Sequence, residues 1–225
     1  ASDGDNVIVP VGNCTWSSAV NITNKTITLK GSGSTTGGTK ITHGGGDHTL
    51  ILVSAGTKTG RMDISGFWYA GKSTNWNGTA IQISGPTGWK NLRIHNNLFD
   101  GNYPWTINVG VNTHGVIDNN TFKGSAFGIK TYGNGASDWS STLTLGNADF
   151  FFVEDNNFDW DDWYGATGTP CVDMFSGGRV VFRNNTIRNG YFGTHDKARS
   201  TLVSANAYEI YNNNISGSDK WKALD

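Results

Sequence analysis

Cysteine, proline, an excess of either charge and long apolar runs are all scarce in this chain, and each shortage excludes a class of protein. Cys14 and Cys171 cannot form a disulfide framework, and their separation along the chain predicts that both are free. A net charge of −1 and a pI of about 6.6 provide no basic surface for nucleic acid. No apolar run is long enough to cross a bilayer, so membrane insertion is not expected.

Glycine and tryptophan are abundant instead. The 225 residues include 31 glycines but only 4 prolines, a composition that suits many short strands joined by tight turns. The segment Ile27-Thr28-Leu29-Lys30 alternates between apolar and polar residues as a half-buried strand does. We therefore predict an all-β protein. Its 9 tryptophans either fill the core or offer flat faces on which sugars stack.

A pair of polar residues, usually Asn-Asn, recurs along the chain. Its second members are spaced by 23, 36, 29 and 28 residues, and they are Asn97, Asn120, Asn156, Asn185 and Asn213. A recurrence at this scale predicts a solenoid, in which each coil buries its apolar face against the next. We interpret these asparagines as corner residues that form hydrogen bonds along the solenoid axis, and not as functional groups.

Apolar residues flank each pair at fixed offsets, and they predict two inward stacks. One stack precedes the pairs and contains Ile94, Ile117, Val153, Phe182 and Ile210. The other follows them and contains Phe99, Phe122, Phe158, Ile187 and Ile215. Ile64 and Tyr69 align with Ile94 and Phe99, so the repeat extends backwards, with Gly66 in place of Asn96.

A second strand in each coil predicts a polar column on one outer face. We align these strands so that Ile81, Ile107, Ile129, Val172 and Thr194 point inward, which turns the following residues outward: Gln82, Asn108, Lys130, Asp173 and His195. Since stacked strands are roughly 4.8 Å apart, the last three would lie within roughly 10 Å. Tyr132 and Lys197 belong to the next outward row. A mixed column of charges is also what an ordinary solvated face looks like.

Two insertions interrupt the repeat, and long loops of a solenoid usually border its binding face. The first runs from Gly133 to Leu145. The second begins at Asp159 and offers aromatic side chains to a substrate, namely Trp160, Trp163 and Tyr164. Its carboxylates, Asp159, Asp161 and Asp162, could instead bind Ca²⁺, although their spacing does not match an EF-hand. Arg199 either contacts substrate or pairs with Asp196.

The repeat, the second-strand ladder and the opening Gly4-Asp5-Asn6-Val7-Ile8-Val9-Pro10 resemble the right-handed parallel β-helix of the pectin-lyase-like superfamily. The resemblance implies a single such helix of about seven or eight coils over residues 1–225, complete or as a segment of a longer solenoid. It also implies a site on the outer face of one sheet, beside long loops. The sequence blocks of polygalacturonases and pectate lyases are absent, and the fold alone cannot choose an activity.

These observations favour a secreted, cell-surface or virion protein that acts on a polysaccharide. The first hypothesis is a polysaccharide lyase on an acidic glycan, with His195 as base, Lys130 or Lys197 as carboxylate clamp, Tyr132 as acid and Asp173 orienting the base. Gln82 and Asn108 would contact the substrate, and no cofactor other than the alternative Ca²⁺ is expected. A glycoside hydrolase would need two carboxylates, which Asp173 and the second insertion could supply.

The alternative class is a non-catalytic glycan-binding or structural β-helix, such as a tailspike segment or a surface adhesin. Both readings expect a polysaccharide partner. The C-terminal end lacks a recognisable cap, so further coils or an oligomer partner are expected there.

Overall fold

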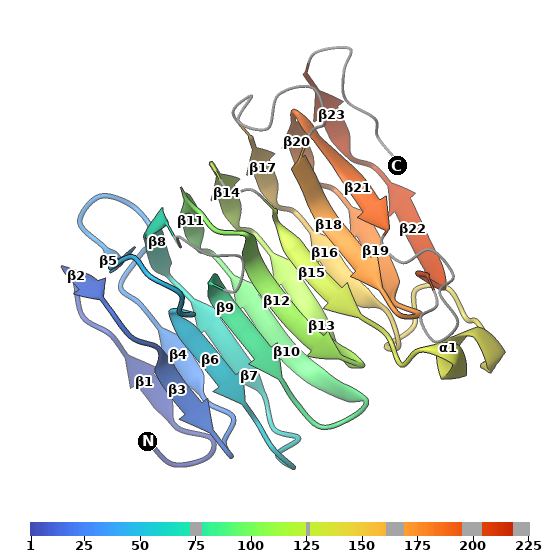
Figure 1. The fold of residues 1–225 in the computed structure, drawn as a ribbon, viewed down its shortest axis with the longest axis horizontal. Coiled ribbons are helices and arrows are strands. Elements are labelled where there is room, and N and C mark those ends of the chain that lie inside the picture. Colours follow the sequence, from blue (N-terminus) through green and yellow to red (C-terminus); the bar gives the residue numbers. More distant parts are fainter. Residues whose placement is uncertain (73–77, 125–126, 161–168, 195–203, 218–225) are drawn as a thin grey trace.

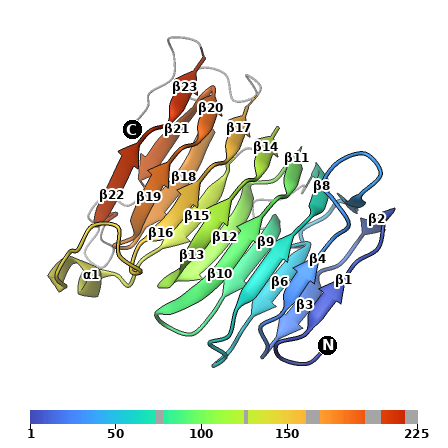
Figure 2. The same ribbon diagram turned by 180° about the vertical axis from the view of Figure 1, so that it is seen from behind.

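The computed structural model describes residues 1–72, 78–124, 127–160, 169–194 and 204–217. They form three parallel sheets that run along one solenoid, with the N-terminal coil at one end and the last coil at the other (Figures 1 and 2). The sheets have 8, 8 and 7 strands. This confirms the predicted all-β, single right-handed parallel β-helix of seven to eight coils, the hand that connections between parallel strands almost always have.

Each coil except the last described one contributes one strand to each sheet, and we name the sheets A, B and C in the order in which the chain meets them. Sheet A contains β1 (Asn6–Ile8), β4 (Thr28–Lys30), β7 (Met62–Ser65), β10 (Trp89–His95), β13 (Thr113–Asp118), β16 (Phe151–Glu154), β19 (Arg179–Arg183) and β22 (Ala207–Tyr211). Sheet B contains β2 (Gly12–Trp16), β5 (Thr39–His43), β8 (Phe67–Lys72), β11 (Leu98–Asn102), β14 (Thr121–Lys123), β17 (Asn157–Asp159), β20 (Thr186–Arg188) and β23 (Asn214–Ser216). Sheet C contains β3 (Val20–Thr23), β6 (Ile51–Ser54), β9 (Thr79–Ser84), β12 (Trp105–Val111), β15 (Ile129–Tyr132), β18 (Thr169–Phe175) and β21 (Gly190–Thr194).

The predicted asparagine ladder forms the corner between sheets A and B. The first residue of each corner has a positive φ, for example 54° at Asn96 and Asn119, which asparagine tolerates better than most residues. The second residue is the ladder asparagine. The Oδ1 atom of Asn120 accepts hydrogen bonds from the backbone N–H and the side-chain amide of Asn97, both at 3.0 Å. The same pattern recurs along the corner, so the structural interpretation of these asparagines is confirmed.

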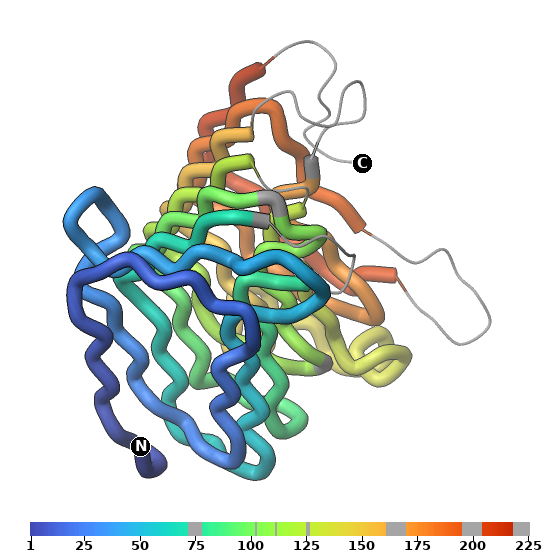
Figure 3. The backbone as a smooth tube through the Cα atoms, turned by 60° about the vertical axis from the view of Figure 1, so that its left-hand side comes forward, coloured from blue at the N-terminus to red at the C-terminus, as the bar shows by residue number. Residues whose placement is uncertain are grey.

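Aromatic side chains stack from coil to coil inside sheet B. The ring centroids of Tyr69 and Phe99 are 5.1 Å apart, those of Phe99 and Phe122 are 5.0 Å apart, and those of Phe122 and Phe158 are 4.6 Å apart. Figure 3 shows how the coils lie over one another with their corners in line. In both predicted inward stacks, each residue pairs with the next member of its stack on the neighbouring strand. Only at the last described coil are their members exposed, with Ile210 at 38% and Ile215 at 44%.

The first predicted insertion carries the one helix of the described residues, α1 (Ala136–Ser140), at the corner between sheets C and A (Figure 1). The buried Arg179 holds it by donating to the carbonyl of Asp138 and the hydroxyl of Ser141. Within the described part of the chain, no helix is long and apolar enough to cross a membrane. Cys14 is exposed and Cys171 is buried, and both are free as predicted.

Candidate functional site

The predicted polar column exists on the outer face of sheet C for four of its five members. Gln82 pairs with Asn108, Asn108 with Lys130, and Lys130 with Asp173. They lie on four successive strands, β9, β12, β15 and β18. The alternation of side chains along each strand therefore predicted which residues share this face.

The fifth member was placed wrongly, because Gly193 and not His195 pairs with Asp173. A bulge between Pro170 and Val172 shifts the register, and Val172 pairs with Phe192. Phe192 is buried and packs on Phe182 with ring centroids 5.7 Å apart. Thr194, two residues later, pairs with Met174 on the same inward side, but it is exposed because β21 is the last described strand of sheet C. His195 and Lys197 lie outside the described residues.

Lys130 sits among three aromatic rings on this face. Its ammonium nitrogen is 4.4 Å from the ring centroid of Phe175, 4.9 Å from that of Trp105 and 5.1 Å from that of Tyr132. Each distance is within the range of a cation–π contact. We call these three rings the aromatic cage. A fourth ring adjoins it, because Trp105 stacks on Phe127 with ring centroids 4.5 Å apart. A lysine held in this way presents a fixed positive charge next to flat apolar surfaces.

Asp173 is outward-facing but buried, with 1% of its surface exposed. Its neighbour Gly193 leaves a narrow space, because a Cβ atom there would lie 3.7 Å from the Oδ1 atom of Asp173 and 3.2 Å from the ring of Tyr191. The sheet register places Lys130 on the other side. The column thus brings a carboxylate and a cation together on adjacent strands, under partial cover from aromatic side chains.

The second predicted insertion contributes less to this surface than we expected from its sequence. Trp160 is buried in the core, 5.9 Å from Phe158 between ring centroids, so the prediction that it stacks on substrate is wrong. Since Phe158 points inward, simple alternation turns Trp160 inward as well. Trp160 also lies beside Cys171, whose thiol has its pKa raised to about 12 by burial.

Asp159, the first proposed calcium ligand, forms an ion pair with Arg188 on the next coil. The described residues contain no cluster of three or more side chains suited to hold a metal. The remaining proposed calcium ligands and substrate contacts lie outside the described residues. They are Asp161, Asp162, Trp163, Tyr164 and Arg199. The calcium site therefore stays a prediction.

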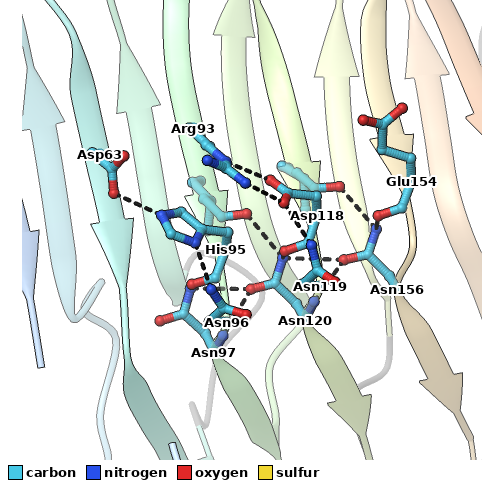
Figure 4. A network of polar contacts seen from close by, with 12 residues as sticks. Asp63, Arg93, His95, Asn96, Asn97, Asp118, Asn119, Asn120, Glu154 and Asn156 are labelled. Carbon is cyan, nitrogen blue, oxygen red and sulfur yellow. Dashed lines mark hydrogen bonds and ion pairs between the residues drawn. The ribbon is translucent and has the colours of Figure 1, made fainter. Parts of the chain in front are cut away.

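A second polar column, which we did not predict, covers the outer face of sheet A (Figure 4). It consists of the residues directly ahead of each corner pair, and His95, Asp118, Glu154 and Arg183 pair in register on successive strands. Glu154 accepts a hydrogen bond of 2.6 Å from Arg183. Asp118 accepts two from Arg93, at 2.8 and 2.7 Å. Burial alone would raise the pKa of Asp118, but the hydrogen bonds from Arg93 and Asn119 lower it.

The pair of Asp63 and His95 in this column has the composition of an acid–base dyad, but its hydrogen bonds indicate a fixed role. The Nε2 atom of His95 lies 3.0 Å from the Oδ1 atom of Asp63. The side-chain amide of Asn96, which can only donate through its nitrogen, lies 2.7 Å from Nδ1. Both ring nitrogens therefore have partners within the protein, and neither is available to a substrate.

The sequence did contain a signal for this second column. Inward residues such as Ile94 and Ile117 imply that their neighbours on either side face outward. The asparagine pairs mark the corner, so the side chain directly before each pair stands on the outer face of the preceding strand. The positions before the pairs read His, Asp, Glu, Arg and Tyr along the chain, a column of groups that can pair with one another.

Comparisons with known proteins identify a similar fold at low similarity. Neither a scan against models of protein families nor a search of curated proteins finds a match. Among solved structures, the pectin methylesterase from Aspergillus niger in a penultimately deglycosylated form matches 100% of this chain and 82% of its own. The TM-score is 0.43 and the sequence identity 13%. A similarity of this size carries no functional argument, so the proposals below rest on the side chains of this protein.

Proposed function

We propose that this protein binds an acidic polysaccharide across the outer face of sheet C and cleaves it by β-elimination. The observation that carries the proposal is the caged ammonium of Lys130 beside the buried carboxylate of Asp173. Flat aromatic faces suit the apolar faces of sugar rings, and a fixed cation suits the carboxylate of a uronic acid. Gln82 and Asn108 extend the face with amide groups for sugar hydroxyls.

In this proposal the chemistry is divided among groups of the same face. A base removes the proton next to the uronate carboxylate, Lys130 stabilises the charge that develops, and Tyr132 protonates the leaving oxygen. His195, which follows Thr194 in sequence, is the proposed base, with Lys197 as a second clamp. Because Gly193 stands opposite Asp173, we now assign Asp173 to the support of Lys130 in place of the orientation of His195. The reaction requires no cofactor, and the substrate is extracellular.

A non-catalytic glycan-binding protein would use the same aromatic and cationic groups without a base. A glycoside hydrolase would pair Asp173 with a carboxylate of the second insertion. A panel of uronic-acid polysaccharides separates these functions, because β-elimination alone produces an unsaturated sugar that absorbs in the ultraviolet. Reducing ends without that absorbance indicate hydrolysis, and binding without either product indicates an adhesin.

Variants test the assigned groups. Lys130→Gln should weaken binding of the acidic polymer about tenfold, the effect of losing one charged hydrogen bond, and reduce cleavage further. Lys123→Gln, which removes an exposed lysine from sheet B, is the matched control and should change neither. His195→Ala should abolish the absorbing product while binding persists. The proposal fails if Lys130→Gln and Lys123→Gln behave alike.

A further inference from the structure

We infer that the outer face of sheet A carries a second and separate binding site, which takes an anionic saccharide. The site is a groove of about 600 Å³ over β4, β7 and β10, which we call the anion groove. Its charged residues are Lys30, Arg61, Asp63 and Arg93. Nothing in this inference depends on the cleavage reaction or on sheet C.

Cations outnumber anions in the anion groove. Lys30, Arg61 and Arg93 are positively charged, while Asp63 is the one carboxylate among the residues that line it. Asp63 pairs with Arg61 and Asp118 pairs with Arg93, so the excess is one cation, Lys30. Lys30 is exposed and forms no ion pair with any described residue. Asp63 is buried and already accepts hydrogen bonds from Arg61 and His95, so its carboxylate does not face a ligand in the groove as a free charge. The potential that a ligand meets is therefore positive.

The two arginines are each held by a carboxylate through Nε and Nη2. Both groups of Arg61 donate to Oδ2 of Asp63, at 3.1 and 2.5 Å. Those of Arg93 donate to Oδ1 and Oδ2 of Asp118, at 2.8 and 2.7 Å. Their side chains are still 60% and 41% exposed, and in the described part of the chain neither Nη1 group has a partner. A guanidinium fixed along one edge loses little further entropy when its free N–H groups bind an oxyanion.

Small polar side chains complete the anion groove and favour a saccharide over a bare ion. The hydroxyls of Thr28 and Ser34, both partly buried, have no hydrogen-bond partner among the described residues. They can donate to and accept from sugar hydroxyls, while Lys30 and the two Nη1 groups bind the carboxylate or sulfate that the sugar carries. His95 is positioning rather than catalytic here, because both of its nitrogens are engaged.

Calorimetric titration of the Lys130→Gln protein tests the inference, because this background weakens the sheet C site. The probes are a galacturonate trimer, the neutral trisaccharide maltotriose and inorganic sulfate. We expect the trimer to bind at one site and more weakly as salt rises, and maltotriose not to bind. Adding Lys30→Gln and Arg61→Gln should weaken trimer binding about tenfold, whereas adding Lys123→Gln should leave it unchanged.

Four results would overturn the inference. They are no binding of the trimer, equal binding of maltotriose, sulfate binding as tight as trimer binding, and equal affinity in the Lys30→Gln/Arg61→Gln and Lys123→Gln proteins. Failure of the lyase proposal is distinguishable, since it shows as missing cleavage in the wild-type protein while trimer binding to the anion groove persists.

Discussion

Removing one central asparagine from the corner ladder should cost far more stability than removing an asparagine beside it. In Asn120→Ala the side chain that is lost accepts two hydrogen bonds from Asn97 and donates to Ile94, Asp118 and Asn156. Asn120 is 1% exposed, so water cannot replace these contacts. The ladder bonds link successive coils, and their loss weakens the contact between three coils at once.

The magnitude follows from which groups lose their partners. The side-chain amide of Asn97 keeps its bonds to the carbonyls of Ile64 and His95, whereas its buried backbone N–H loses the acceptor at 3.0 Å. A buried donor left unpaired costs about 2 kcal/mol, and the remaining lost bonds add about 1 kcal/mol net. We therefore expect the free energy of unfolding to fall by about 3 kcal/mol.

Urea unfolding followed by tryptophan fluorescence measures this difference. Asn157→Ala is the matched control, because Asn157 is exposed next to the ladder, and it should change stability by about 0.5 kcal/mol or less. Asn213→Ala, at the partly exposed last rung, should fall between the two. If Asn120→Ala costs less than about 1 kcal/mol, the ladder contributes no more than an exposed turn and our reasoning is refuted.

Two further predictions concern acid and thiol chemistry. Burial lowers the pKa of His43 and of His114, so below the unfolded value of about 6.5 the unfolded chain binds more protons and stability should fall as the pH falls. Urea midpoints at neutral and mildly acidic pH check this, and His43→Gln should reduce the pH slope; an unchanged slope contradicts it. A thiol reagent should label Cys14 alone in the native protein and Cys171 only after denaturation, since burial raises the pKa of Cys171 to about 12. Native labelling of both would contradict the described burial.

The coil-to-coil stacking was predictable because each asparagine pair marks the same point of every coil. Counting from Asn97, Asn120 and Asn156 reaches Phe99, Phe122 and Phe158, which do stack in register. Alternation then determines which neighbours face inward and outward. Aligning the second strand of each coil placed Lys130 beside Asp173 correctly, so the part of the candidate site with regular strands could be predicted.

What could not be predicted depends on departures from that regularity. The bulge beside Pro170 moves the register of β21 by one residue. The sequence match between Gly128 and Gly193 aligned Val172 with Thr194, whereas Val172 pairs with Phe192, so His195 was placed beside the wrong residue. Trp160 was misjudged for a different reason. Its neighbours in sequence are acidic, but the inward position two residues after Phe158 decides its burial.

The corner between sheets A and B is two residues long in five successive coils, although the coils between ladder asparagines vary from 23 to 36 residues. The variation therefore falls on the lengths of the strands and on the other two corners, which border sheet C. Residues 134–149, none of which is buried, make up most of the longest of these corners. The molecule thus combines one corner of constant length with two corners of variable length. Changes in the variable corners can alter ligand preference on sheet C while the asparagine ladder stays the same.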